Sequence, residues 1–385
     1  MIIRLLGVSA LALAAPVHAE TQVIHAGRVI TAAGSAPLGE STITVTDGRI
    51  VSIAPGHAPV PAGATEIDLS GKTVLPGLID MHVHLSGDPG GDFWKEAVEP
   101  DEWGVVVGAR NALKTVRAGF TTVRDLGSAR EVGFVLSRGT AEGMIPGPRI
   151  VSSGPAISII GGHGDVSGFR PEVNAVLDAG NTCTGAEQCA ARVREASKNG
   201  ADVIKITATG GVLSQQGRGL GQHFTEAEMK SIADTAHSLG LRVAAHAHGA
   251  RGIESAARAG IDTIEHGTFA DAAAIKVMKE KGTAYVPTLM AFTGIGDRLG
   301  KGVYTPTVEA KVRETLGNVG KALNAAHKAG VTIVFGTDAA VYEHGRNAEE
   351  FARMVELGGL TPAEALASAT TTAAKLLDME SEIGR

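Results

Sequence analysis

Histidine, lysine and aspartate side chains recur in this sequence near the ends of short apolar segments. His82 and His84 stand one residue apart in the run LIDMHVHL, and His246 and His248 repeat that spacing in RVAAHAHG. Residues i and i+2 of a strand point to the same face, so each pair would present two imidazoles together. Paired imidazoles suit metal chelation, whereas a single strand histidine is more often a hydrogen-bonded structural residue.

Three further residues occupy similar positions. Lys205 lies in DVIKITATGG, His266 in IDTIEHG and Asp338 in VTIVFGTDAA. An ammonium group among isoleucine and valine carries a large desolvation cost unless it is paired or chemically altered. Asp338 taken alone is equally well explained as a helix cap. Taken together with the histidines, these residues predict a metal-dependent catalytic site.

The segments that carry these residues predict the fold. Apolar strand candidates alternate with amphipathic helical segments over residues 73–84, 120–127, 148–154, 201–211, 242–249, 261–267, 283–289 and 331–340. Eight consecutive βα units predict a (β/α)8 barrel of the TIM type over residues 74–385, and they favour it over a doubly wound open sheet. In such barrels the active site lies at the carboxyl ends of the strands, which is where the candidate residues fall. No glycine-rich dinucleotide fingerprint follows the first strand.

Glycines mark the expected ends of the helices between these strands. A glycine stands just before the next strand at Gly119, Gly200, Gly240, Gly260, Gly282 and Gly330. Glycine is the preferred residue just past a helix C-terminus.

The N-terminal region reads differently. Residues 20–73 alternate in the short period of β-strands, and Asp47-Gly48 between two such runs is a strong hairpin signal. This pattern predicts a small β-sandwich domain. Residues 1–19 combine a basic start, an apolar core and a small-x-small motif ending at Ala19, and they predict a secretory signal peptide. The mature protein is therefore expected to be periplasmic or secreted.

Composition narrows the classes of partner. The 385 residues carry a net charge of −6 and no run rich in lysine or arginine, which argues against a nucleic-acid-binding protein. After the signal peptide no apolar segment is long enough to predict a membrane span. Cys183 and Cys189 could form a disulfide in an oxidising compartment or remain unpaired, and the sequence leaves both open. Zinc binding by this pair is disfavoured because no second pair has matching spacing.

The run GKTVLPGLIDMHVH, with Lys205, two later histidines and Asp338, resembles the amidohydrolase superfamily. The similarity is greatest to imidazolonepropionase-like and prolidase-type enzymes, a group that includes secreted amidases acting on ochratoxin. It extends over nearly the whole chain after the signal peptide. Relatives usually continue with strands that return to the β domain, whereas this sequence ends at SEIGR. An incomplete β domain, or a chain that is part of a longer one, is therefore expected.

The resemblance implies a centre of two divalent metal ions, usually zinc, and a role for each ligand. Asp338 would also be the catalytic residue, which takes a proton from water and delivers it to the leaving amine. The ligands implied are His82, His84 and Asp338 for the more buried ion, His246 and His266 for the more exposed ion, and Lys205, carboxylated by CO2, as a bridge between the two.

The resemblance further implies hydrolysis of a small-molecule amide, such as an N-acyl amino acid or a dipeptide with an apolar C-terminal residue, by a homo-oligomer. Deamination is the nearest rival, but deaminases generally place a glutamate shortly after the histidine equivalent to His246 and lack a lysine ligand. Lactone or imidazolone ring opening would use the same centre, and the signal peptide argues against imidazolone chemistry. An inactive oligomeric scaffold is a non-enzymatic alternative, but such proteins typically lose ligands and none is missing here.

Candidates for substrate contact are less specific. His163 lies among glycines in GGHGDVSG, which permits close approach of a ligand, but it could equally be a solvated loop residue. His248 is expected one layer nearer the barrel mouth than His246, as a substrate contact or as a support for the metal ligands. Val212 and Leu213 could line an apolar pocket. Arg218 could meet a substrate carboxylate, although a plain flexible loop is favoured there.

Overall fold

The computed structural model describes residues 20–90, 93–215 and 219–385, and these form two compact units. One unit comprises the described residues up to Thr31 together with Ser35–Leu75, and the other comprises Ala32–Gly34 and Pro76–Arg385. The predicted signal peptide and the candidate substrate contact Arg218 lie outside the described residues. In the part of the chain that is described, no helix has the length and apolar character needed to cross a membrane.

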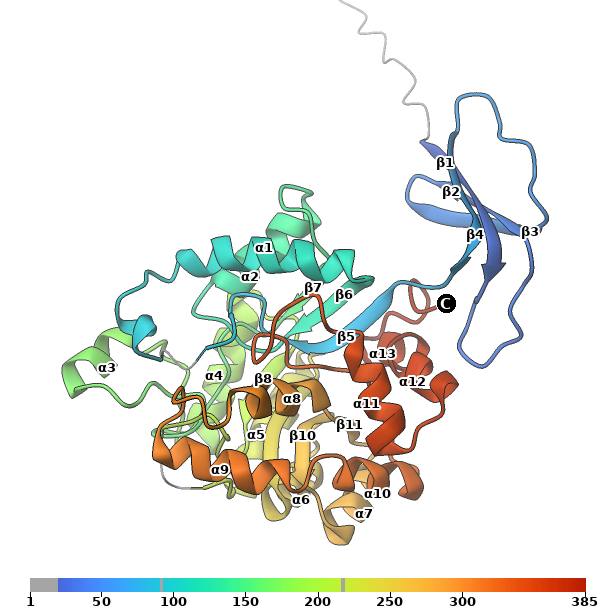
Figure 1. Ribbon diagram of the computed structural model, residues 1–385. Coiled ribbons are helices and arrows are strands. Elements are labelled where there is room, and N and C mark those ends of the chain that lie inside the picture. The colour runs from blue at the N-terminus through green and yellow to red at the C-terminus, as the bar shows by residue number, and fades with distance from the viewer. Residues whose placement is uncertain (1–19, 91–92, 216–218) are drawn as a thin grey trace, which may run out of the picture. The chain divides into compact units, whose positions relative to one another are not determined.

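The first unit is built on one four-stranded sheet (Figure 1). Neighbouring strands pair antiparallel except for the parallel pair β1 and β4. In spatial order the strands are β3 (Arg49–Pro55), β2 (Ser41–Thr46), β1 (Thr21–Val29) and β4 (Thr65–Val74).

The hairpin predicted in this unit is present. Asp47 and Gly48 join β2 to β3, and both have positive φ angles of 50° and 73°, as a two-residue turn matched to the strand twist requires. The sequence predicted a sandwich of two sheets, but the described strands form a single layer. Four strands supply only a small core, which consists of Ala26, Val29 and Ile43 with partly buried neighbours from the same sheet.

The second unit contains two parallel sheets. The three-stranded sheet has the order β5 (Leu78–Val83), β6 (Phe120–Asp125) and β7 (Arg149–Ser152). The four-stranded sheet has the order β11 (Ala284–Val286), β10 (Thr263–Phe269), β9 (Val243–Gly249) and β8 (Ile204–Thr207). Nearly every residue of these strands is buried, as expected for parallel strands covered on both faces. Seven of the eight predicted strands are therefore observed.

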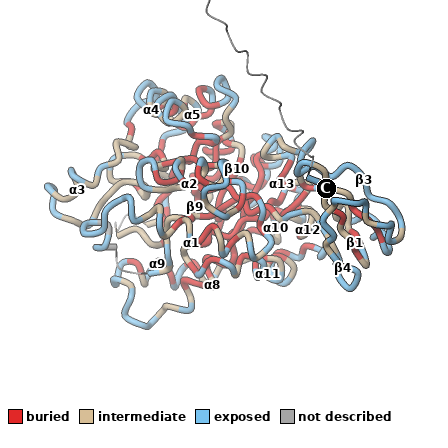
Figure 2. The backbone as a smooth tube through the Cα atoms, turned by 90° about the horizontal axis from the view of Figure 1, so that it is seen from above, coloured by how far each residue is buried: buried red, intermediate tan, exposed pale blue. Residues whose placement is uncertain are grey.

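The helices of the second unit surround these strands. Figure 2 shows the buried residues concentrated in the interior of this unit, with exposed residues on the helices around it. All six glycines predicted at helix ends have positive φ angles. The helices are a 3-10 turn, η1 (Phe93–Ala97), and α1 (Trp103–Arg117), α2 (Val132–Ala141), α3 (Pro171–Leu177), α4 (Ala186–Asn199), α5 (Glu226–Ser238), α6 (Ala250–Ala259), α7 (Ala272–Lys281), α8 (Leu289–Arg298), α9 (Pro306–Leu316), α10 (Lys321–Ala329), α11 (Glu349–Gly358), α12 (Pro362–Ser368) and α13 (Thr371–Leu376).

The eighth predicted strand, residues 331–340, is extended only in part. It forms single parallel bridges, from Ile333 to Tyr285 of β11 and from Ala339 to Val83 of β5. Between the bridges the backbone N–H of Met81 donates to the carbonyl oxygen of Phe335 at 3.0 Å, and that of Asp338 donates to the carbonyl oxygen of His82 at 2.7 Å. The buried carboxylate of Asp80 adds to these contacts, because it accepts hydrogen bonds from the backbone N–H and the hydroxyl of Thr337, at 3.1 and 2.7 Å. The expectation of a regular strand here was wrong, yet the segment still runs beside β5.

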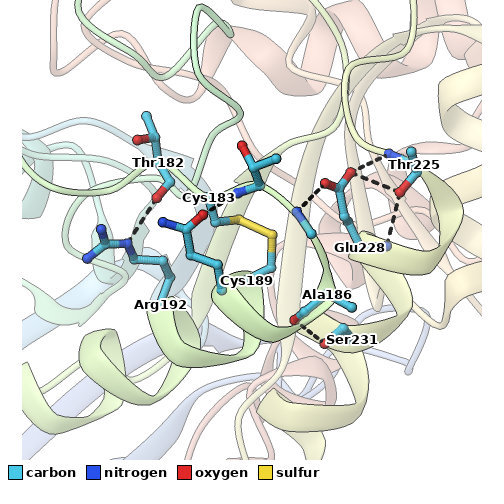
Figure 3. The surroundings of a disulfide bond; sticks show 11 residues. Thr182, Cys183, Ala186, Cys189, Arg192, Thr225, Glu228 and Ser231 are labelled. Carbon is cyan, nitrogen blue, oxygen red and sulfur yellow. Dashed lines mark hydrogen bonds between the residues drawn. A yellow bond between two sulfur atoms is a disulfide. The ribbon is translucent and has the colours of Figure 1, made fainter.

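A disulfide joins Cys183 to Cys189, in the first turn of α4, which settles the alternative that the sequence left open (Figure 3). Both cysteines are buried. The segment before the bridge braces the loop that carries His163, since the side-chain amide of Asn181 donates to the carbonyl oxygens of Ala156 and Gly164 at 2.5 and 2.9 Å. The disulfide therefore anchors a loop close to the candidate site.

Replacing both cysteines with serine is expected to lower the free energy of unfolding by about 2 kcal/mol, because the short loop closed by the bridge removes only modest entropy from the unfolded chain. Urea denaturation measures the change. Reduced wild-type protein should match the double variant, and an unchanged midpoint in both would contradict a structural role for the disulfide.

Candidate metal centre

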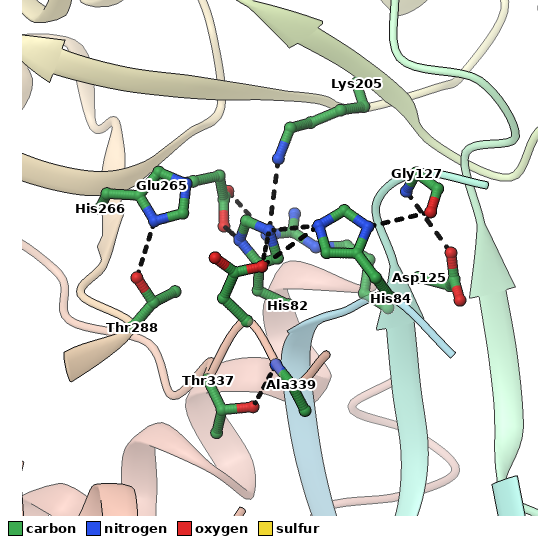
Figure 4. Close-up of polar contacts among 12 residues, drawn as sticks. His82, His84, Asp125, Gly127, Lys205, Glu265, His266, Thr288, Thr337 and Ala339 are labelled. Atoms are coloured by element: carbon green, nitrogen blue, oxygen red, sulfur yellow. Dashed lines mark hydrogen bonds and ion pairs between the residues drawn. The ribbon is translucent and has the colours of Figure 1, made fainter. Parts of the chain in front are cut away.

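The predicted ligands come from four strands and from the segment that follows Ile333. Figure 4 shows four of them, His82, His84, Lys205 and His266, directed toward one another. Each strand is a short buried run, and the candidate ligand is the fifth of six residues in β5, the second of four in β8 and the fourth of seven in both β9 and β10. The parallel arrangement of neighbouring strands brings these positions together. β5 supplies His82 with His84 just after it, β8 supplies Lys205, β9 supplies His246 and His248, β10 supplies His266, and Asp338 follows from the 331–340 segment.

One group of three ligand atoms consists of His82, His84 and Asp338. Nε2 of His82 and Nε2 of His84 are 3.3 Å apart. Oδ1 of Asp338 lies 3.5 Å from the first and 3.2 Å from the second. Nζ of Lys205 lies 3.4 Å from Nε2 of His82, on the same side. Four chemically suitable atoms therefore face one point.

A second group consists of His246, His248 and His266, whose ligand atoms lie within 4.8 Å of one another. Their ring centroids are 4.6 Å apart between His246 and each of the others, and 5.0 Å apart between His248 and His266. All three side chains are buried. The two groups adjoin through His82 and His266, whose ring centroids are 5.1 Å apart.

Hydrogen bonds on the outer ring nitrogens orient the histidines. Nδ1 of His82 donates to Oε2 of Glu265 at 2.8 Å, and Nδ1 of His84 donates to the carbonyl oxygen of Gly127 at 2.9 Å. Because both acceptors lack protons, Nδ1 carries the hydrogen and Nε2 keeps its lone pair. His246 is reversed, since its Nε2 lies 3.3 Å from the carbonyl oxygen of Gly210 and its Nδ1 is left for a ligand.

Glu265 and Arg124, which the sequence analysis missed, form a buried ion pair beneath His82. Nη2 of Arg124 lies 2.9 Å from Oε1 of Glu265, and neither side chain is more than 2% exposed. Nε of Arg124 donates to the carbonyl oxygen of Met81 at 2.7 Å, which ties the pair to the backbone of β5. The sequence did contain a signal for this ion pair. Arg124 in FTTVRD and Glu265 in TIEH are charged residues inside predicted buried strands, and buried charges require partners.

The electrostatics of the site favour a neutral imidazole at His82 and an ionised carboxylate at Asp338. His84 differs, because burial would lower its pKa but the hydrogen bond and the charge of Asp338 raise it above its usual value. Burial lowers the pKa of His82 to about 4, with the charge of Lys205 adding to the effect. Burial would raise the pKa of Asp338, but His82 and His84 hold it well below its usual value. Burial lowers the pKa of Lys205 to about 8, against the opposing pull of Glu265 and Asp338. Neutral nitrogen and anionic oxygen are the states in which these groups bind metal ions.

The backbone is strained at two of these residues. His266 has a φ of 69° and Asp338 a φ of 59°, in the left-handed region that non-glycine residues rarely adopt. Hydrogen bonds hold both residues in place. The hydroxyl of Tyr285 donates to the carbonyl oxygen of His266 at 2.8 Å, and the backbone N–H of Asp338 donates to the carbonyl oxygen of His82 at 2.7 Å. Such strain is typical of sites whose geometry is imposed by the surrounding fold.

A cavity of about 450 Å3 opens onto the site, a size typical of small-molecule pockets. All four candidate substrate contacts among the described residues line it, namely His163, His248, Val212 and Leu213. Nδ1 of His163 lies 2.5 Å from Oγ of Ser214, so two loops meet at this point. The lining residues that the sequence analysis missed include the polar Ser86, Ser128 and Thr207. They also include an apolar group, formed by Leu126, Val341 and, on α8, Ala291, Phe292 and Ile295.

His248 is deeper than expected. The sequence analysis placed it one layer nearer the mouth than His246, but His248 is 2% exposed and His246 is 6% exposed. Its ring is held by Oγ1 of Thr268, 2.9 Å from Nδ1.

Comparison with known proteins finds a match to the Amidohydrolase family over residues 73–385. The chain is 33% identical to an ochratoxinase of Aspergillus niger over 386 aligned positions, which cover 94% of this chain and 78% of that protein.

Solved structures give the same result. A Xaa-Pro dipeptidase with methionine bound in its active site superposes with a TM-score of 0.86 and 35% identity, covering 95% of this chain and 90% of that one. A prolidase complexed with N-methylphosphonate-L-proline gives a TM-score of 0.85 and 32% identity, covering 95% and 89%. The crystal structure of A. niger ochratoxinase gives 0.80 and 30%, covering 93% and 85%.

Proposed function

Since this chain belongs to the amidohydrolase family and is a hydrolase of amide bonds, we propose that it cleaves N-acyl amino acids or dipeptides that end in an apolar residue. The observation that carries this proposal is the apolar cavity that opens directly onto the convergent histidines and Asp338. A substrate side chain in that cavity would leave its amide bond beside the polar site.

The donor set fits the divalent ions that the family generally binds, and zinc is the ion we propose. Imidazole nitrogens and carboxylate oxygens are its usual protein ligands. His82, His84 and Asp338 would hold the more buried ion, and His246 and His266 the more exposed one. A protonated amine would repel two cations, and an uncharged amine has one lone pair and could serve only one of them. We therefore propose that Lys205 is carboxylated and would supply anionic oxygen to both.

When bound, such a pair of ions would activate water and polarise the scissile carbonyl. The residues of this chain supply the rest of the chemistry. Oδ1 of Asp338 faces His82 and His84, so we assign Oδ2 to accept the proton of the attacking water and to deliver it to the leaving amine. Glu265 keeps the proton of His82 on Nδ1, which holds the ring in one tautomer.

The cavities support an elongated substrate. Val212 and Leu213 join the apolar wall of the inner cavity, and His163 lies where a substrate carboxylate or carbonyl could accept its hydrogen bond. A second cavity of about 790 Å3 shares Ser86, Ala156 and other lining residues with the first, and it contains both charged and aromatic groups. We propose that the apolar C-terminal residue occupies the inner cavity and the acyl group extends into the outer one.

Three further expectations, on closure of the barrel, on export and on assembly, form part of the same proposal. The two parallel sheets would belong to one (β/α)8 barrel, in which residues 331–340 take the place of the eighth strand. Parallel bridges from Ile157 to Ile206, from Ile333 to Tyr285 and from Ala339 to Val83 support this closure.

Export with cleavage near Ala19 and assembly as a homo-oligomer are likewise proposed, and the support for export is the sequence of residues 1–19.

A hydrolysis screen with zinc-reconstituted protein tests the proposal. We expect release of the C-terminal amino acid from N-acetyl-phenylalanine, N-acetyl-methionine, leucine-terminated dipeptides and ochratoxin A, with the acidic counterpart N-acetyl-glutamate cleaved at least about tenfold more slowly because its charge would have to enter the apolar cavity. Dialysis against a chelator should abolish turnover and zinc should restore it. Turnover of lactones without any amide cleavage, or full activity after chelation, would contradict the proposal.

A further inference from the structure

His248 is not among the ligands that the family resemblance implies, yet it lies within the second group of convergent nitrogens. Its ring centroid is 4.6 Å from that of His246 and 5.0 Å from that of His266. The rings of His248 and His266 are nearly parallel, with an angle of 17° between their planes. One ligand nitrogen from each of His246, His248 and His266 lies within 4.8 Å of the others, so the three histidines can reach one ion from neighbouring strands.

The hydrogen bonds of His248 leave one nitrogen for a ligand. Its Nδ1 is 2.9 Å from Oγ1 of Thr268, and its backbone N–H donates to Oγ1 of Thr209 at 3.0 Å. The partner of Nδ1 in His266 is likewise a threonine hydroxyl, that of Thr288, at 2.7 Å. Nε2 of each ring is thus directed away from its threonine, in the arrangement usual for metal-binding histidines.

The depth of His248 argues against a contact with substrate alone. His248 is 2% exposed, against 6% for His246 and 5% for His266. A residue that meets substrate above two ligands should be more exposed than those ligands, and His248 is less exposed than both.

We propose that His248 is a third nitrogen ligand at the more exposed metal position. His246, His248 and His266 then form a three-histidine site that binds a borderline divalent cation such as Zn2+, in place of the substrate contact that the sequence predicted for His248. Three imidazoles with one open position are an established arrangement for catalytic zinc. This inference rests on the proposed function, because the site opens into the same cavity.

The proposal changes the role of Lys205. The buried position has three ligands of its own in His82, His84 and Asp338, and the exposed position has three histidines. Carboxylated Lys205 would bridge two sites that are each already capable of holding an ion. Binding at the exposed position should therefore persist without CO2.

Zinc titration of chelator-treated protein against a chromophoric competitor tests the site. Wild-type protein should bind two ions, and His248→Ala should weaken one of them by about 100-fold or more, since loss of an outer-shell partner alone costs roughly 10- to 100-fold. His163→Ala is the matched control, because its ring centroid is also close to that of His246, at 4.2 Å, but it is not part of the group. It should retain both affinities.

Three more variants separate the alternatives. Lys205→Ala in CO2-depleted buffer should still bind an ion at each position, and the addition of His248→Ala should remove only the ion at the more exposed position. Thr268→Val should weaken the same site roughly tenfold while keeping His248 in place. The cobalt-substituted protein gives a second readout, since the absorption band of the exposed ion should change on loss of a nitrogen ligand.

The outcomes distinguish this inference from the proposed function. A wild-type protein that binds no metal ion would contradict the proposed function itself. Two ions bound with wild-type affinity by both His248→Ala and His248→Gln, with native circular dichroism, would overturn only the role given to His248. The glutamine variant decides the matter if the alanine variant does not fold.

Discussion

Asp338→Asn should lower kcat for a cleaved amide by roughly 10²- to 10⁴-fold, the range usual for loss of a general acid and base. The carboxylate is held in its ionised form by His82 and His84, so it is able to accept a proton at neutral pH. The asparagine side chain has nearly the same size and keeps one carbonyl oxygen, but it is not basic. Steady-state kinetics on the best substrate of the screen measure the effect, and metal analysis of the same sample shows whether both ions remain bound.

A matched aspartate provides the control. Asp234 lies exposed on α5, where its Oδ1 is 2.8 Å from Nζ of Lys230. Among the described residues this is its only ion pair. Asp234→Asn should leave kcat unchanged. If Asp338→Asn kept kcat within about a factor of three of the wild type with both ions bound, proton transfer would have to be assigned to another group.

Glu265→Ala should lower the free energy of unfolding by about 3–5 kcal/mol, the usual cost of removing one partner of a buried ion pair. The substitution leaves the guanidinium of Arg124 buried without its carboxylate, and it also removes the acceptor of Nδ1 of His82. Urea denaturation in the presence of a chelator isolates this effect, because neither protein then gains stability from bound metal. Zinc affinity, measured separately, should fall roughly 10- to 100-fold.

Two comparisons separate charge burial from ligand support. Glu254→Ala removes the partner of Arg258 in an exposed pair on α6 and should cost no more than about 0.5 kcal/mol. The double variant Arg124→Met with Glu265→Leu removes both buried charges and should recover most of the stability, but not the zinc affinity. Recovery of the zinc affinity in the double variant would show that Glu265 does not orient His82.

The grouping of the site residues could be predicted because it follows from one rule. Polar residues at the carboxyl ends of buried parallel strands meet at one edge, and His82, Lys205 and His266 are each embedded in a recognisable apolar run. The rule needs only the strand positions and not their order in space. It remained valid at Asp338, although the segment around that residue is not a regular strand.

The partners around the site could not be predicted in the same way. Glu265 and Arg124 lie 141 positions apart in the chain, and their pairing depends on which strands are neighbours. The wall of the cavity is a second example. The period of α8 identifies a helix, but which of its residues reach the cavity depends on the angle at which it leaves β11. The depth of His248 likewise depends on the local path of β9.

The left-handed backbone at His266 and Asp338 bears on any attempt to engineer this protein. A side chain in that conformation costs about 1–2 kcal/mol relative to glycine. Directed evolution that selects only for heat resistance would therefore favour glycine codons at these two positions and erase the catalyst while improving the scaffold. A mutant library intended to raise thermal stability should keep both codons unchanged, or hydrolytic activity should be assayed in every round of selection.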